Sequence, residues 1–132
     1  LIPAEHALPD IAATAMLFLG TPYLWGGNTG TGIDCSGLIQ MALWAAGHTC
    51  PRDSDLQEAQ LGLELPENAP LKRGDLIFWA GHVGMMLDPE TLIHANAHHM
   101  RVATEPLAGA TARIGAREFG EITARKRLEP VP

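Results

Sequence analysis

The hydrophobic pattern of this chain changes its period once, near Leu71, and this change limits the fold more than any other feature of the sequence. Before Leu71, apolar residues recur at the spacing of amphipathic helices. After it, short apolar runs are separated by turn signals, which is typical of strands joined by hairpins. The predicted strands are 76–79, 82–87, 92–97, 101–104 and 121–127, and residues 110–119 are ambiguous. Helices followed by hairpin-linked strands predict an α+β domain, with N-terminal helices packed on an antiparallel sheet of about five to six strands.

The first half of the chain contains three predicted helices. They cover residues 11–19, 35–46 and 54–61, and a glycine follows each of them. Asp10 is the predicted cap of the first helix, and Ser54 and Gln57 have the form of a capping box in the third. Residues 21–33 are predicted to be loop.

Length and charge exclude several classes of protein. The 132 residues suffice for one domain with its own core, so we predict a single domain over 1–132. A net charge of −6 gives no electrostatic footprint for nucleic acid. No apolar run approaches the roughly 20 residues of a membrane helix. Because the chain starts at Leu1 without an initiator Met or a signal peptide, we expect it to be part of a longer or processed protein.

The two cysteines, Cys35 and Cys50, are too few for a disulfide framework. A helix over 35–46 would separate them along its length, whereas a disulfide needs Cα atoms within about 7 Å. We therefore predict two free thiols.

A glycine-rich loop, GGNTGTG, precedes Cys35 and allows two interpretations. Such a loop can cradle a phosphate at a helix start. Here the lysine of a phosphate-binding loop is missing, because Ile33 stands in its place, and the carboxylate of Asp34 would repel a phosphate. The loop is better suited to presenting a nucleophile, because glycines leave space in front of the Cys35 sulfur.

Cys35 lies in the first turn of a predicted helix, where the helix dipole favours thiolate over thiol. A thiolate nucleophile also needs an imidazole. Alternation along the predicted strands places His82 and Gly84 on one face, where the glycine would keep that face open. A two-residue hairpin near Asp88-Pro89 would put His94 on the adjacent strand, in reach of the far ring nitrogen of His82.

Two plainer interpretations stay open on the residues alone. A lone cysteine is often a small buried hydrophobe. A zinc site could also be drawn from the cysteines and histidines, although no pair has the usual ligand spacing. The residues concerned are Cys35, Cys50, His82, His94, His98 and His99.

Five segments together resemble the NlpC/P60 family of papain-like cysteine peptidases. They are TPYLWGGNTGTGIDCSGLIQ, CPRDSDLQ, LKRGDLIFW, GHVGMML and TLIHANAHHM, and their order and spacing match over about residues 8–127. The resemblance implies the papain-like NlpC/P60 fold and a catalytic domain without metal or cofactor. The arrangement of the motifs is also similar to the catalytic part of bacterial proteins that carry SH3-like domains upstream, so the resemblance implies an SH3-like domain before this one.

The resemblance assigns roles to individual residues. It implies that Cys35 is the nucleophile, His82 the general base and His94 the residue that orients the base, with Asn96 as the alternative orienting residue. Tyr23 matches the family tyrosine near the nucleophile, whose hydroxyl can join the oxyanion site.

The residues that flank the nucleophile, Asp34 and Ser36, match positions that hold the amino end of the substrate in some family members. Asp34 also fits a helix cap. Arg52 is expected to form a structural ion pair.

The implied activity is hydrolysis of the γ-D-glutamyl-diamino acid bond in peptidoglycan stem peptides, in a periplasmic or secreted setting or in cytoplasmic recycling. Three alternatives are an amidase or acyltransferase on another substrate, a binding module without catalysis, and a structural zinc protein.

Overall fold

The computed structural model describes residues 10–29 and 31–128. Its helices are α1 (Ile11–Met16), α2 (Cys35–Ala45), α3 (Ser54–Gln60) and α4 (Leu107–Arg117). Its strands are β1 (Asn28–Thr29), β2 (Gly32–Ile33), β3 (Leu63–Glu64), β4 (Leu76–Trp79), β5 (His82–Met86), β6 (Thr91–Asn96), β7 (Arg101–Pro106) and β8 (Ile122–Arg127). The α+β class is therefore confirmed.

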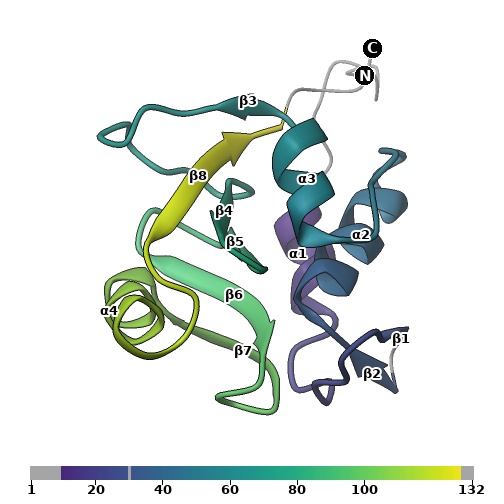
Figure 1. Ribbon diagram of the computed structural model, residues 1–132. Coiled ribbons are helices and arrows are strands. Elements are labelled where there is room, and N and C mark those ends of the chain that lie inside the picture. The colour runs from purple at the N-terminus through teal and green to yellow at the C-terminus, as the bar shows by residue number, and fades with distance from the viewer. Residues whose placement is uncertain (1–9, 30, 129–132) are drawn as a thin grey trace.

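The main sheet has six strands in the order β3-β8-β4-β5-β6-β7, and all neighbouring strands run antiparallel. This confirms the predicted sheet. Figure 1 shows α1, α2 and α3 together on one side of the sheet and α4 on the other. Since β5, β6 and β7 are consecutive in both chain and sheet, residues on these strands come together with little loop between them.

Period-two alternation in the strands separates two hydrophobic clusters, one on each face of the sheet. Val83 and Met85 face the cluster that includes Leu38 and Ile39 of α2. Met86 faces a smaller cluster with Ile114 of α4. β5 is therefore buried on both faces, which fixes the direction of every side chain along it.

Helix α1 ends at Met16, three residues before the predicted end. Asp10 caps it as predicted, by accepting from the Ala13 N–H. The next three residues donate to carbonyls three positions back rather than four, so the chain tightens into 3₁₀-like turns before Gly20. Leu19 is consequently 48% exposed and does not share the buried face of Ile11, Ala12 and Ala15.

The capping box predicted for α3 is wrong. The N-cap is Asp53, without a side-chain cap bond. The amide of Gln57 instead points into the protein and donates to the carbonyl oxygens of Ser36 and Pro51. A buried donor with two carbonyl acceptors is satisfied there, which the local pattern alone could not show.

Several segments differ from the predicted elements, among them the unpredicted strand β3. The ambiguous residues 110–119 belong mostly to α4, which begins at Leu107. The predicted loop over 21–33 contains the small β1–β2 hairpin. The turn after β5 is longer than the predicted two residues, because Asp88 Oδ1 accepts from the backbone N–H groups of Glu90 and Thr91 and rounds the corner more widely.

Within the described residues, none of the helices has the length and apolar character needed to cross a membrane.

Candidate active site

The thiol of Cys35 lies at the N-terminus of α2, against the start of β5. Asp34 caps the helix by accepting from the Gly37 N–H at 2.7 Å. The glycine loop passes close by, and a Cβ on Gly27 would lie 2.5 Å from the Gly32 carbonyl oxygen, so this position requires glycine. Cys35 and Cys50 are both free thiols, as predicted.

The electrostatics of Cys35 differ from the sequence-based prediction. Burial raises the pKa of the Cys35 thiol, and this effect exceeds the opposing hydrogen bonds from the backbone of Val83 and of the helix start. The N–H groups of the helix terminus therefore act in the predicted direction, but desolvation is larger. The resting group is a thiol at neutral pH rather than a thiolate.

His82, the first residue of β5, is 3% exposed. Its ring stacks on Phe119 with centroids 5.2 Å apart, and its Nε2 lies 2.7 Å from Nδ1 of His94 on β6. Burial, together with His94 and Arg113, lowers the pKa of His82 to about 3. The imidazole is neutral at pH 7, so it can accept a proton.

Gly84 was predicted to keep its face of β5 open. In the structure its missing side chain instead gives room to side chains of β6. A Cβ at Gly84 would lie 2.7 Å from Cδ1 of Leu92 and 3.1 Å from Cβ of His94. The space beside Gly84 is thus filled by β6 side chains and is not open.

Asn96, the alternative orienting residue, has other partners. Its amide donates to the His94 carbonyl oxygen at 3.3 Å, and its oxygen accepts from the N–H of His99 at 2.9 Å. The structure therefore places His94, not Asn96, on His82.

Sequence reasoning missed Glu105 and Arg113. Glu105 Oε2 lies 2.6 Å from Nε2 of His94, and Arg113 donates to both carboxylate oxygens at 2.7 and 2.9 Å. A signal was present: alternation along β7 puts Glu105 on the face of Ala103, which pairs with His94. The predicted strand ended at residue 104, two positions before the end of β7 and one before Glu105.

Arg52 forms the expected ion pair with Asp34. Its guanidinium donates to both Asp34 oxygens at 3.0 and 3.1 Å, to Ser36 Oγ and to the Gly27 carbonyl oxygen. Ser36 Oγ also donates to Asp34 at 3.3 Å. Asp34 therefore accepts hydrogen bonds from the start of α2, from the Gly26 N–H of the glycine loop and from Arg52 after α2.

A cavity of about 600 Å³ opens at Cys35. Tyr23, Asp34, Ser36 and Arg52 are among the residues that line it, together with Phe119 from the segment after α4. Burial raises the pKa of Tyr23, with smaller contributions from Cys35 and Asp34, so its hydroxyl is protonated and able to donate at neutral pH. The full lining is Tyr23, Trp25, Gly26, Asp34, Cys35, Ser36, Arg52, Asp53, Ser54, Gly81 and Phe119.

The set proposed for zinc does not assemble as a set. Of its members, His94 and His99 come together with Glu105, each offering a ligand atom within 4.8 Å of the others. Arg113 already places a positive charge on that carboxylate, which opposes a cation. The ring of His98 packs edge-to-face on that of His99, with centroids 4.9 Å apart.

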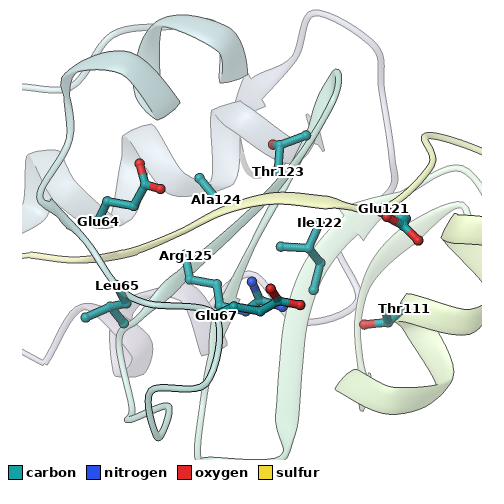
Figure 2. Close-up of a pocket in the computed structure, with 9 residues that line it drawn as sticks. All are labelled: Glu64, Leu65, Glu67, Thr111, Glu121, Ile122, Thr123, Ala124 and Arg125. Carbon is teal, nitrogen blue, oxygen red and sulfur yellow. The ribbon is translucent and has the colours of Figure 1, made fainter.

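Figure 2 shows a second cavity, of about 460 Å³, along β8 and α4. Glu64, Glu67 and Glu121 are among its lining residues, and Glu67 lies next to Arg125 (Figure 2). It shares no lining residue with the cavity at Cys35.

The fold is an α+β domain, and its site combines a cysteine at a helix start with two hydrogen-bonded histidines on adjacent strands. These features define the class of proteins with a thiol–imidazole site. The NlpC/P60 family profile matches residues 20–114. The chain belongs to the NlpC/P60 family.

Named relatives share the sequence over most of this chain. The "Dipeptidyl-peptidase 6" of Lysinibacillus sphaericus is 38% identical over 93 residues, which is 70% of this chain and 34% of the relative. The "Gamma-D-glutamyl-L-lysine dipeptidyl-peptidase" of Bacillus subtilis is 39% identical over 95 residues, 65% of this chain and 31% of the relative. This chain thus spans about a third of the length of these relatives.

The fold is also similar to a solved structure, that of the peptidoglycan hydrolase RipB from Mycobacterium tuberculosis. The TM-score is 0.75 at 30% identity, and the match covers 96% of this chain and 68% of the other.

Proposed function

We propose that this domain is a cysteine endopeptidase that hydrolyses the γ-D-glutamyl-diamino acid bond of bacterial cell-wall peptides. The observation that supports it most is the 2.7 Å contact of His82 with His94, at the strand whose next residue, Val83, hydrogen-bonds to the Cys35 thiol. The names of the relatives support the choice of bond.

In the proposed mechanism, His82 takes the thiol proton as the Cys35 sulfur bonds to the carbonyl carbon of the substrate. The backbone N–H of Cys35, which points out of the helix terminus, and the Tyr23 hydroxyl stabilise the oxyanion. The C–N bond then breaks, and the amine leaves with the proton from His82. Water adds to the thioester, the acid is released, and the proton returns to the sulfur.

Asp34 and Ser36 remain predicted contacts for the amino end of the substrate. Both line the cavity. Arg52 already donates to oxygens of both side chains, so a substrate amine would share these oxygens with the guanidinium. An upstream SH3-like domain in the same chain also remains a prediction.

The substitution Cys35→Ala tests the proposal. Without the sulfur no thioester can form, so cleavage of L-Ala-γ-D-Glu-diamino acid peptides should fall by at least about 10³-fold. Cys50→Ala is the matched control, because Cys50 is also a half-buried free thiol and does not line the cavity at Cys35. Its activity should stay near that of the parent.

Mass spectrometry of digested peptidoglycan identifies the bond. New amino termini on the diamino acid are expected from the proposed peptidase. Products with a different cleaved bond would indicate an amidase or acyltransferase. Cleavage by the Cys35→Ala variant would refute the assignment of Cys35 as the nucleophile.

A further inference from the structure

We propose that Glu105, held by Arg113, is a positioning residue that sets the proton arrangement of both histidines and so leaves Nδ1 of His82 free to act as the base. This inference rests on the proposed function, because it concerns the same site. It adds two residues, on β7 and α4, to the three that the family resemblance assigned.

The geometry is a continuous chain of short contacts across four successive elements. His82 Nε2 and His94 Nδ1 are 2.7 Å apart, and His94 Nε2 and Glu105 Oε2 are 2.6 Å apart. Arg113 closes the chain with a two-point contact, from two guanidinium nitrogens to the two oxygens of Glu105. Such a planar contact fixes the orientation of a carboxylate as well as its charge.

The charge at the far end of this chain is fixed. Partial burial acts to raise the pKa of Glu105, but the hydrogen bonds from Arg113 and His94 outweigh it and hold this pKa well below its usual value. Glu105 is therefore a carboxylate at every pH at which the enzyme would work. A carboxylate only accepts hydrogen bonds.

The proton positions follow from this one acceptor. Nε2–H of His94 must donate to Glu105, so Nδ1 of neutral His94 has a lone pair. Nε2–H of His82 then donates to that lone pair, and Nδ1 of neutral His82 is unprotonated. A lone pair on His82 Nδ1 is what proton transfer from Cys35 needs.

Burial prevents water from replacing these contacts. The His94 side chain is 0% exposed and that of Glu105 11% exposed. The other titratable or charged groups near the chain are His99 on the turn after β6, 3.9 Å from Glu105, and Glu118 after α4, 3.9 Å from Arg113. Neither touches His82 or His94 by a hydrogen bond within the described residues.

Glu105→Gln is the decisive variant. Its amide oxygen can still accept from Arg113, which turns the NH₂ group toward His94. Nε2 of His94 would then accept, its Nδ1–H would donate to His82, and the proton of His82 would move to Nδ1. We expect kcat to fall by about 10²-fold or more, with KM changed less than about twofold, because the base is held in the wrong form.

Two measurements separate this role from a merely structural one. The ¹⁵N spectrum of histidine-labelled protein should show protonated Nε2 at His82 in the parent and protonated Nδ1 in Glu105→Gln. The rate of iodoacetamide alkylation at Cys35, followed by mass spectrometry, should fall in parallel. Neither uses a cell-wall substrate, so both can succeed even if the proposed substrate is wrong.

The matched control is Glu118→Gln, which removes a carboxylate near Arg113 without touching His94. It should leave the His82 tautomer and kcat near parent values. Unchanged His82 tautomer in Glu105→Gln, or equal losses of kcat in both variants, would overturn the proposal.

Arg113→Gln provides a second route if Glu105→Gln does not fold. It keeps the carboxylate on His94 but removes its cation. We expect a smaller loss of kcat at neutral pH than in Glu105→Gln, because the carboxylate stays on His94 but loses its fixed orientation. We also expect a new acid limb that approaches the ordinary pKa of a glutamate. An unchanged acid limb would contradict the role of Arg113.

Discussion

At the scale of single residues, the site holds two uncharged partners rather than an ion pair. Burial raises the pKa of the Cys35 thiol and lowers that of the His82 imidazole, so both shifts favour thiol with neutral imidazole at pH 7. In the proposed mechanism, proton transfer from Cys35 to His82 would therefore accompany attack on the substrate. For this reason the position of the free lone pair on His82 matters more than the charge of the ring.

Arg52 gives a testable prediction at this scale. Its side chain is 30% exposed and its partner Asp34 only 12% exposed, so loss of the two-point contact leaves a largely buried carboxylate with fewer donors. Arg52→Lys should lower the free energy of unfolding by about 1–3 kcal/mol. Urea unfolding measures this change.

Arg73→Lys is the control for Arg52, since Arg73 and Asp10 form an ion pair in which the side chains are 45% and 53% exposed. Exposed pairs contribute less than about 1 kcal/mol. Equal losses in the two variants would show that burial of Asp34 has no energetic consequence.

At the scale of elements, β5 can bring His82 next to His94 of β6 because the β5 residue that packs against His94 is a glycine, Gly84. Gly84→Ala would place a methyl group 2.7 Å from Leu92 Cδ1 and 3.1 Å from His94 Cβ. We expect a loss of about 1–3 kcal/mol in the free energy of unfolding, and a lower kcat because His94 is displaced. Thermal unfolding and steady-state kinetics measure the two effects.

Gly109→Ala in α4 is the matched control, because a Cβ there meets no atom within 4 Å. Alanine is the better helix former, so this variant should gain up to about 1 kcal/mol. A Gly84→Ala protein as stable and active as the parent would contradict the close approach of β6.

The same elements show how far the sequence predicted the fold. Alternation correctly assigned the sides of β5, because Val83 and Met85 contact α2 while Met86 contacts α4. It failed for α4 and for the end of β7, where Glu105 was left outside the strand. In both places the decisive contacts come from tertiary packing rather than from local periodicity.

At the scale of the whole molecule, the buried imidazole makes stability depend on pH. The pKa of His82 is lowered to about 3 in the folded protein, against 6.5 for an ordinary histidine. Between pH 6.5 and about 3, His82 takes up a proton in the unfolded chain but not in the folded protein. The folded state is therefore most favoured by this residue above pH 6.5, and this stability is lost as the pH falls toward 3. Glu105, with its lowered pKa, adds a loss of the same sign below its usual value of 4.5.

Unfolding in urea at pH 7, 6 and 5 should therefore show falling stability, by up to about 1.4 kcal/mol per pH unit from the single proton on His82. His82→Asn removes the group that takes up this proton. The free energy of unfolding of the variant should therefore depend less steeply on pH, by the slope that corresponds to about one proton. A parent whose stability is flat from pH 7 to 5 would contradict the burial of a neutral His82.

The sequence by itself determined the first three helices, the strands β4 to β8 and the face shared by His82 and Gly84, because these depend on neighbours one to four positions away. It did not determine α4 or the short strands β1, β2 and β3. The free state of both cysteines and the Arg52 ion pair were also predicted and are observed. The predicted contact of His94 with His82 is observed, and only the tertiary structure revealed that Glu105 and Arg113 stand behind His94. It also decided that burial outweighs the backbone hydrogen bonds in setting the direction of the pKa shift at Cys35. The contact of Arg113 with Glu105 and the loss of water around Cys35 join residues that meet only through folding, so no local pattern of side chains encodes them.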